Sequence, residues 1–492
     1  MQESEKRGAE RLLDVTRRQF IYNLSTGIGA LALGAMGCGK GVGEKPKPNL
    51  AAPGPAASLH LPHFQPRARR VIFLHMAGAP SQLEMFDYKP VLHKLDGQDC
   101  PQSFLAGKRF AFIKGVPKML GPQASFKQYG QSGAFVSENL PFFSDVVDEV
   151  CLLKAMHTDE FNHAPAQLFM HTGSPRLGRP SMGSWVTYGL GTENQDLPGF
   201  IVLASGGMPD AGKSAWGSGF LPTVYQGVQC RSEGDPVLYV SDPAGMDRDL
   251  KGDVIETINA VNAHHHTRVG DPEINSRIAQ YEMAFRMQIS VPEVIDISKE
   301  PEYIHKLYGT QPGKSSFANN CLLARRLVEQ GVRFVQLFHR GWDTHGVGTG
   351  DDVIKGVQNQ CKDVDQAIAG LLKDLKQRGL LDDTLVVWGG EFGRTPMRES
   401  RPGADPKAMG RDHHSEAFTM WVAGGGIKGG MSYGETDEIG YLGVKDRVHI
   451  HDLQATLLHC LGMDHEKFTY PFQGRDFRLT DVHGKVVKGI LA

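Results

Sequence analysis

The sequence lacks the features that most quickly assign a protein to a class. It has no large excess of charge, because 53 basic and 55 acidic residues leave a net charge of −2. Nothing therefore steers the whole chain toward nucleic acid or an acidic membrane, and we expect no nucleic acid partner. Seven cysteines are scattered along 492 residues without a Cys-x-x-Cys pair, which argues against a cysteine-ligated zinc site.

Long apolar runs are also missing. The stretch at residues 21–36 is mildly apolar and rich in glycine, and it is too short and too polar for a comfortable transmembrane span. What the sequence has in abundance is glycine, with 59 residues, well above the usual fraction of about 7%. Many tight turns and long loops follow, as in α/β scaffolds that carry their sites on loops.

Basic residues precede that apolar stretch. The segment TRRQFI, residues 16–21, closely resembles a twin-arginine export signal. We therefore predict that residues 1–38 are a twin-arginine export signal and that the twin-arginine export machinery is a partner. The protein is expected to be exported to the periplasm or the cell envelope.

Two ways of processing this signal remain open. The segment ALA, residues 30–32, suits an ordinary signal peptidase, whereas AMGC, residues 35–38, resembles a weak lipoprotein box. In the second case the protein would contact the membrane only through a lipid anchor on Cys38. Residues 39–69 contain six prolines and are predicted to form a semi-rigid linker before the folded domain at 70–492.

Short, uniformly apolar segments alternate with helical patterns from residue 70 onward. Such segments are typical of strands that are covered on both faces. The alternation predicts an α/β fold with a doubly wound, mostly parallel sheet flanked by helices, in which sites form at the carboxyl ends of the strands. The predicted strands are 71–76, 150–155, 200–205, 332–339, 384–390 and 418–426, and the predicted helices are 137–150, 181–190, 274–288, 316–330, 354–378 and 453–461.

Two further segments stand apart from this alternation. Residues 205–315 have few strand signals and many polar loops, and we predict a cap or insertion there. Its histidine run, 264–266, is predicted to be solvated rather than metal-binding. At the C-terminus, residues 477–487 predict a hairpin with its turn at 483–485.

Histidines, carboxylates and arginines gather just after predicted strands. Because such loops meet at one sheet edge, we expect these side chains to lie close together. Imidazole with carboxylate suits a divalent cation, and an arginine beside it suits an oxyanion such as sulfate or phosphate. The residues concerned are His157, His163, Asp343, His345, Glu391, Arg394, Arg411, His413 and His414.

Seven sequence motifs are similar to those of a known family. The chain resembles the exported, sulfatase-like bacterial domain-of-unknown-function family 1501 over residues 70–492. That family is related to the alkaline phosphatase superfamily, which includes arylsulfatases. The resemblance implies an alkaline phosphatase-like, doubly wound sheet with metal at its carboxyl edge. The motifs are AGAPSQLEMFDYKP, NHAPAQLFMHTG, SMGSWVTYGLG, FANNCLLARRLVEQGVRFV, GWDTHG, VVWGGEFGRTP and GRDHHSEAFTMWVAGGG.

At the site, this sequence departs from the sulfatase pattern at several positions. His163 stands where sulfatases have their nucleophile, and Gln167 stands where they have an arginine. Glu391-Phe392 replaces the usual metal-binding Asp-His or Asp-Asn, so Glu391 is a candidate ligand and Phe392 is not. A formylglycine nucleophile is excluded, because position 163 is neither cysteine nor serine. A histidine nucleophile and a metal-activated water both remain open.

We therefore predict an exported metal-dependent hydrolase of sulfate or phosphate esters, with a small-molecule or glycan ester as substrate. The predicted cofactor is a divalent metal, zinc, manganese, calcium or iron. Catalytic roles are predicted for His163, Arg394 and Arg411, where the two arginines would hold the oxyanion. The alternative is a catalytically degenerate sulfatase-like protein that binds sulfated glycans or serves as an envelope scaffold. The predicted metal ligands are His157, His163, Asp343, His345, Glu391, His413 and His414.

Overall fold

The computed structural model describes residues 62–105, 107, 113, 115–230, 248–348, 350–399 and 407–492. The chain divides into two units, residues 1–54 and 55–492, and all the described residues belong to the second. The predicted export signal, the candidate lipid anchor and most of the predicted linker lie outside the described residues. None of the described helices is long and apolar enough to cross a membrane.

A nine-stranded sheet forms the centre of the second unit. Strand β1 pairs in parallel with β7 on one side and with β8 on the other, and β7 pairs in parallel with β5. Strand β11 runs antiparallel to both β8 and β4, whereas the other paired strands described in this sheet run parallel. The prediction of a mostly parallel sheet is therefore confirmed. These strands are β1 (Arg70–Ala77), β4 (Val150–His157), β5 (Phe200–Ser205), β7 (Phe334–Arg340), β8 (Thr384–Gly389) and β11 (Phe418–Ala423), with short strands β6 (Val228–Cys230), β12 (Met431–Tyr433) and β15 (Val448–His449) at the margins.

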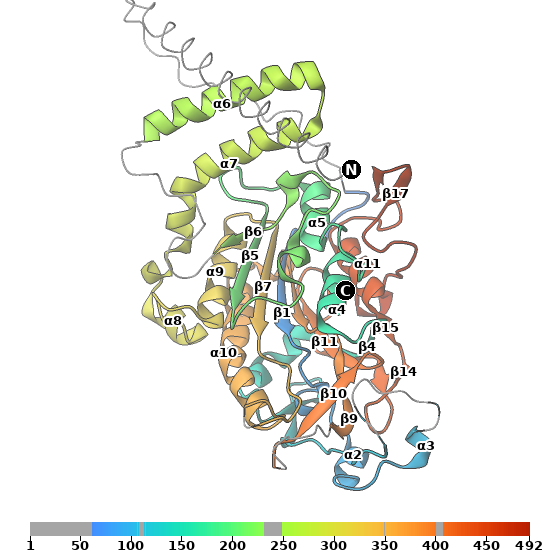
Figure 1. Ribbon diagram of the computed structural model, residues 1–492. Helices are drawn as coiled ribbons and strands as arrows, with labels where there is room; N and C mark the ends of the chain where they lie inside the picture. The colour runs from blue at the N-terminus through green and yellow to red at the C-terminus, as the bar shows by residue number, and fades with distance from the viewer. Residues whose placement is uncertain are drawn as a thin grey trace, which may run out of the picture. The chain divides into compact units, whose positions relative to one another are not determined.

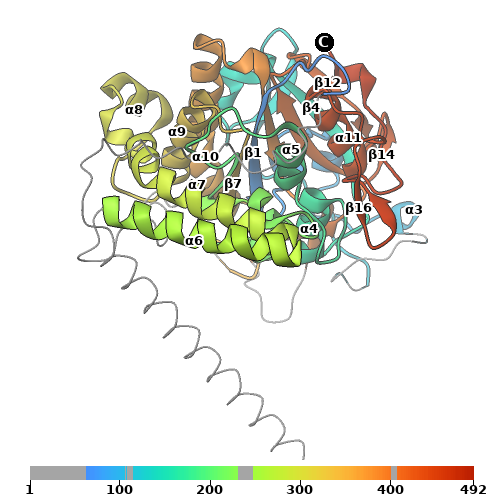
Figure 2. The ribbon, with the colours of Figure 1, turned by 90° about the horizontal axis from the view of Figure 1, so that it is seen from above.

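Helices cover both faces of this sheet (Figures 1 and 2). In β1 the buried residues alternate between two cores, with Ile72 and Leu74 in one and Val71 and Phe73 in the other. This alternation explains the uniformly apolar strands, because side chains on both faces must be buried. The first core is completed by α8 (Glu302–Tyr308), α9 (Phe317–Glu329) and α10 (Lys355–Gln377), and the second by α4 (His163–Thr172), α5 (Met182–Leu190) and α11 (Ile450–Cys460).

The predicted insertion folds mainly as two long helices. Helix α6 (Arg248–Val269) packs along α7 (Pro272–Ile295), which also contacts α9. Figure 1 draws this pair at the opposite end of the domain from β9 and β10. The helices therefore do not form a cap over the carboxyl edge of the sheet. The histidine run 264–266 lies near the end of α6, where His264 and His265 are exposed.

Two local predictions are wrong. The predicted helix at 137–150 is instead the end of strand β3 (Ala134–Ser137) followed by the 3-10 helix Phe143–Glu149. The terminal hairpin lies earlier than predicted, in β16 (Tyr470–Phe472) and β17 (Arg475–Phe477). Its two-residue turn has positive φ angles at both Gln473 (49°) and Gly474 (79°), as such tight hairpins require. Glutamine is an unusual residue for the first of these positions, which hid the turn.

A two-stranded ribbon stands apart from the main sheet. Strands β9 (Gly393–Glu399) and β10 (Gly410–His414) pair antiparallel, with Arg394 opposite His413. Strand β9 follows β8, and β10 precedes β11. Because β11 is antiparallel to β8, both ends of the ribbon connect to the same edge of the sheet. The ribbon thus adds side chains to the edge where the parallel strands end.

Candidate metal centre

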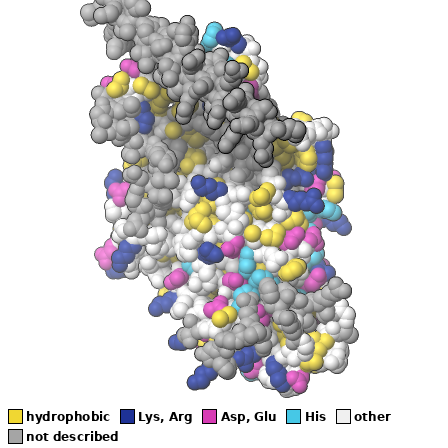
Figure 3. Space-filling model, viewed as in Figure 1, with side chains coloured by type: hydrophobic (Ala, Val, Ile, Leu, Met, Phe, Trp, Pro, Cys, Tyr) yellow, Lys and Arg dark blue, Asp and Glu magenta, His cyan; other side chains and the backbone are white. Residues whose placement is uncertain are grey.

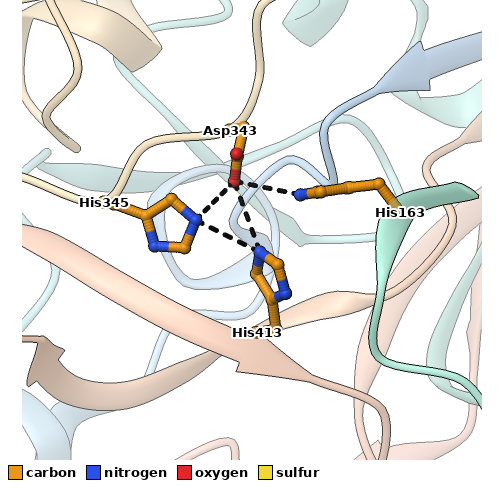
Figure 4. A group of neighbouring side chains, drawn as sticks. All are labelled: His163, Asp343, His345 and His413. Atoms are coloured by element: carbon orange, nitrogen blue, oxygen red, sulfur yellow. Dashed lines mark hydrogen bonds and ion pairs between the residues drawn. The ribbon is translucent and has the colours of Figure 1, made fainter. Parts of the chain in front are cut away.

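Segments from distant parts of the chain bring four side chains to the carboxyl edge of the sheet. His163 is the first residue of α4, shortly after β4. Asp343 and His345 follow β7, and His413 lies on β10. Figure 4 shows the three imidazoles directed toward the carboxylate of Asp343. One potential ligand atom from each residue lies within 4.8 Å of the other three.

The backbone beneath this group is closely packed. Gly78, which follows β1, has a φ of +111°. A Cβ atom at this position would lie 2.6 Å from the Asp343 nitrogen and 2.9 Å from the Trp342 nitrogen. Glycine is therefore required here both for its conformation and for its size. The contact holds the start of the Asp343 loop against the end of β1.

Asp343 is the centre of the contacts. Its Oδ1 atom lies 3.1 Å from His163 Nε2, 2.8 Å from His345 Nε2 and 3.4 Å from His413 Nε2. The Nε2 atoms of His345 and His413 lie 3.2 Å apart. A metal with four tetrahedral ligands at about 2.0 Å separates its ligand atoms by about 3.3 Å. These four spacings are close to that value, and the other pairs of ligand atoms lie within 4.8 Å, so the four side chains can share one metal ion that also takes a water molecule as a further ligand.

Each imidazole is held from behind through its Nδ1 atom. His163 Nδ1 lies 2.7 Å from Glu391 Oε1, and His345 Nδ1 lies 2.5 Å from Glu399 Oε2. His413 Nδ1 lies 2.7 Å from the carbonyl oxygen of Phe161. A carbonyl only accepts hydrogen bonds, and so does an ionised carboxylate, so each Nδ1 carries the proton. This is the outer-shell pattern of metal-bound histidines.

The contact between His345 and His413 follows from these protonation states. In a neutral imidazole with its proton on Nδ1, the Nε2 atom carries a lone pair. Two such lone pairs 3.2 Å apart repel one another unless a cation lies close to both. A metal ion meets this requirement, and so does an added proton. The donor set therefore fits a cation, and three imidazoles with one carboxylate suit a transition metal.

The carboxylate and the imidazoles strongly affect one another's ionisation. Burial opposes the charge on Asp343, but its contacts with His163, His345 and His413, which donate from Nε2 when the rings are protonated, hold its pKa far below the usual range. Burial would also lower the pKa of His163, but hydrogen bonds to Asp343 and Glu391 raise it to about 9. Burial lowers the pKa of His413 to about 4. Hydrogen bonds to Asp343 and Glu399 also raise the pKa of His345 against the effect of burial, so without a metal His163 and His345 hold protons more readily than His413 does.

Phe392, which stands where the related families have a metal ligand, instead supports two of the candidate ligands. Its ring centroid lies 4.9 Å from that of His163 and 4.7 Å from that of His413. The side chain is buried and packs against both imidazoles, whose own ring centroids lie 4.5 Å apart. The residue that departs from the superfamily pattern therefore fixes the orientation of two candidate ligands.

Arg394 lies against the group, with its side chain fully buried. Its Nη2 atom donates to Asp343 Oδ1 at 2.6 Å and to the Gly78 carbonyl at 2.6 Å. Its Nε atom donates to the Ala79 carbonyl at 2.9 Å, and Nη1 donates to the Arg411 carbonyl at 3.2 Å. The guanidinium fixes the carboxylate of Asp343, so its donors are engaged by the protein itself.

Arg411 was predicted to hold an oxyanion, but its side chain is directed elsewhere. It is fully buried, and it forms an ion pair of 2.7 Å with Glu84. Its remaining donors contact the carbonyl oxygens of Leu120, Gly121 and Thr395. The prediction failed because Glu84 is 327 positions away in the sequence and no local pattern links the two residues.

Three predicted metal ligands do not belong to the group. His157, at the end of β4, lies beside His449 with ring centroids 5.0 Å apart. Glu391 lies behind His163, where Oε1 also accepts hydrogen bonds from Gln167 Nε2 and the Gly78 nitrogen. His414 places Nε2 2.5 Å from the Tyr441 carbonyl, because neighbouring residues of a strand point to opposite faces.

Glu399 is the residue that the sequence prediction missed. It ends β9, and its side chain is fully buried against His345. No predicted strand or motif included it. Only the pairing of β9 with β10 brings it toward the site, and that pairing depends on contacts distant in the sequence.

The group reaches the surface of the molecule. The side chain of Asp343 is 42% exposed, whereas that of His163 is 15% exposed. Figure 3 shows histidine side chains gathered beside acidic ones in the lower middle of this face. The carboxylate is therefore the most solvent-accessible part of the group.

Comparisons with known proteins give one family and several solved structures. The family model described as "Protein of unknown function (DUF1501)" matches residues 68–491. The chain is similar to alkaline phosphatase from the Antarctic bacterium TAB5, at 11% identity over 80% of this chain and 98% of that chain, with a TM-score of 0.31. It is similar to the PsFucS1 sulfatase from Pseudoalteromonas sp., at 11% identity, 81% and 69% coverage and a TM-score of 0.35. A third similar structure is the C-terminal periplasmic domain of EcEptC from Escherichia coli in complex with Zn, at 9% identity, 83% and 87% coverage and a TM-score of 0.35.

Proposed function

The chain belongs to the family of proteins of unknown function DUF1501, and we propose that it is an exported metal-dependent hydrolase of sulfate or phosphate esters. One divalent metal would be held by His163, Asp343, His345 and His413. The facing Nε2 atoms of His345 and His413, 3.2 Å apart and both held from behind, are the observation that carries this proposal.

The donor set narrows the choice of metal. Three imidazole nitrogens and one carboxylate oxygen favour zinc, manganese or iron, whereas calcium takes oxygen ligands. When bound, such an ion lowers the pKa of a water molecule and polarises an ester oxygen. The resemblance to sulfatase-like proteins supports a sulfate or phosphate ester as the substrate.

The surrounding residues have defined roles in this proposal. Arg394 holds Asp343 Oδ1 at 2.6 Å and so fixes the one anionic ligand. Glu391 and Glu399 keep the protons of His163 and His345 on Nδ1 and direct both Nε2 atoms inward. Phe392 restricts rotation of the His163 and His413 rings. The site would thus be organised before the metal or the substrate binds.

Water, rather than His163, is the proposed nucleophile. Both nitrogens of His163 are engaged, Nδ1 with Glu391 and Nε2 with Asp343. A histidine nucleophile needs one nitrogen directed at the ester, and this arrangement leaves neither. The oxygen of water would form a bond to sulfur or phosphorus, and the ester oxygen would leave as an alcohol after it gains a proton. The products are an alcohol and inorganic sulfate or phosphate.

The main experiment measures metal and turnover in the same preparation. Full-length protein purified from its producing cells is analysed for bound metals and assayed with 4-nitrophenyl sulfate and 4-nitrophenyl phosphate. We expect about one zinc, manganese or iron per chain and turnover that is lost on chelation. No bound metal would overturn the metal site. Bound metal without turnover of either ester would instead favour a protein that binds sulfated glycans or serves as an envelope scaffold.

Export and anchoring are separate parts of the proposal. Arg17 and Arg18 are the twin-arginine pair, and Cys38 is the candidate lipid attachment site. Replacing both arginines by lysine is expected to keep the protein in the cytoplasm. Labelling with a radioactive fatty acid, compared between the wild type and Cys38→Ser, decides between a lipid anchor and cleavage by an ordinary signal peptidase.

A further inference from the structure

A half-exposed arginine lies at the same sheet edge as the proposed metal site. Arg340 is the last residue of β7, and it pairs in register with Ala77 at the end of β1. Its side chain is 49% exposed. Because Asp343 follows three positions later, the two Cα atoms are at most about 10 Å apart. Arg340 therefore lies at the same edge of the sheet as Asp343, with its side chain half exposed.

The neighbouring loop is shaped to fit Arg340. Gly206 and Gly207, just after β5, have φ angles of 70° and 114°. A Cβ atom on Gly206 would lie 2.7 Å from the Arg340 carbonyl oxygen, and one on Gly207 would lie 3.5 Å from Arg340 Cδ. Two consecutive glycines thus let the loop pack against both the backbone and the side chain of this arginine.

The same loop connects Arg340 to the metal site. Arg340 Nη2 donates to Asp210 Oδ1 at 2.9 Å. Gln167 Nε2 lies 3.4 Å from Asp210 Oδ2 and donates to Glu391 Oε1 at 2.9 Å, and Gln167 Oε1 accepts from the Ala211 nitrogen. Glu391 in turn holds His163. Arg340 is therefore fixed in position relative to the proposed metal ligands.

The three arginines near this edge differ in what they can bind. Arg394 and Arg411 are fully buried, and their donors contact Asp343, Glu84 and backbone carbonyls. Arg340 has one acceptor among the described residues, Asp210, and a guanidinium offers five N–H donors. A planar guanidinium with an open edge can bind a sulfate or phosphate group through two hydrogen bonds.

We propose that Arg340 binds a second anionic group of the substrate, so that the site prefers esters that carry at least two anionic groups. This inference rests on the proposed function for the identity of the reacting ester. It adds the substrate class, polyanionic esters, and the residue that selects them.

The test measures binding rather than turnover. Benzenesulfonate and benzene-1,3-disulfonate are titrated into full-length, metal-loaded protein by calorimetry. One hydrogen-bonded charge pair corresponds to about a tenfold change in affinity, so we expect the disulfonate to bind about tenfold more tightly. Arg340→Gln is expected to abolish this preference, and Arg340→Lys to retain part of it. Bound metal, measured in each variant, is expected to equal that of the wild type.

Arg475 provides a matched control. Its side chain is 48% exposed and pairs with one carboxylate, that of Asp481. It lies on β17, which Figure 1 places at the opposite end of the domain from β9 and β10. Arg475→Gln should keep the wild-type preference. A preference that persists in Arg340→Gln, or that is absent from the wild type, would overturn the inference. Protein that prefers the disulfonate but hydrolyses no ester would contradict the proposed function and leave the anion site standing.

Discussion

Two groups of charged side chains in this molecule differ in whether their charges are balanced by the protein itself. In the first, Arg325 lies 2.8 Å from Glu300, 2.8 Å from Glu329 and 2.9 Å from Asp374. Tyr308 donates to Asp374 at 2.9 Å. Every charge in this group faces an opposite charge, so the group is complete without any added ion.

The group around Asp343 is not complete in this way. One carboxylate oxygen contacts three imidazoles and Arg394, and two imidazole nitrogens that carry lone pairs face each other. Burial and charge are common to both groups. The difference is that the second contains two imidazole nitrogens at close range, which need a metal ion or an added proton between them. The candidate site is therefore marked by the close contact between two imidazole nitrogens, rather than by buried charge itself.

The largest expected effect comes from removing the central ligand. Asp343→Ala takes away one metal ligand and leaves Arg394 without its carboxylate. Loss of the metal removes several kcal/mol of transition-state stabilisation, so we expect turnover of 4-nitrophenyl esters to fall by at least about 1000-fold. Metal content measured on the same sample should fall with it. Full activity with bound metal in this variant would place the reaction elsewhere.

Breaking the complete group should affect stability alone. Arg325→Met removes the buried partner that Glu300 and Asp374 share and leaves them Arg326 and Arg378, so we expect a loss of up to about 3–5 kcal/mol of unfolding free energy. Urea unfolding followed by fluorescence measures this change. Arg378→Met is the matched control with a smaller expected loss, since its side chain is 30% exposed. Loss of metal from folded Arg325→Met protein would contradict the separation of the two groups.

A smaller effect is expected behind the metal ligands. Glu399→Gln keeps an acceptor for His345 Nδ1 but removes the charge. Replacing an outer-shell partner costs about 10–100-fold in metal affinity. Competition with a chromogenic chelator measures it, and Glu435→Gln, in an exposed pair with Lys445, is the control. Equal affinities in the two variants would show that Glu399 has no role in orienting His345.

The smallest effects concern histidines that lie outside the group. His157→Asn and His414→Asn are expected to change metal content and turnover by less than about twofold, because neither side chain contacts Asp343. Metal analysis and the ester assays apply again. A loss of metal in His157→Asn would extend the site toward β4.

The sequence predicted where the candidate site lies in the fold better than it predicted which side chains form it. Parallel strands end at one edge, so polar residues that follow them are brought together, and Asp343, His345 and His413 do lie side by side. Side-chain direction is a different matter. His413 and His414 are adjacent, and only the pairing of β10 with β9 decides which of them faces Asp343. The uniformly apolar strands likewise predicted the sheet, because burial on both faces leaves a clear pattern.

Local sequence patterns could not predict the role of a side chain whose partner lies far away in the sequence. Arg411 and Arg394 look alike in the sequence, since each lies near a strand end among polar residues. Glu84 engages one and Asp343 the other, and these partners lie 327 and 51 positions away. The sequence assigned Glu391 to the metal because a carboxylate after a strand is a plausible ligand. His163 stands between Glu391 and Asp343, which only the fold reveals.

The separation of the ligands along the chain has a consequence for biosynthesis. His163 and His413 are 250 positions apart, so no growing chain offers the complete donor set until β10 has been made. Metal acquisition must then follow folding, because the unfolded chain has no preformed site. If the chain binds a metal and crosses the membrane folded, as the proposed twin-arginine signal implies, that metal would come from the cytoplasmic supply. The metal found in protein from the cell envelope would therefore report where folding was completed.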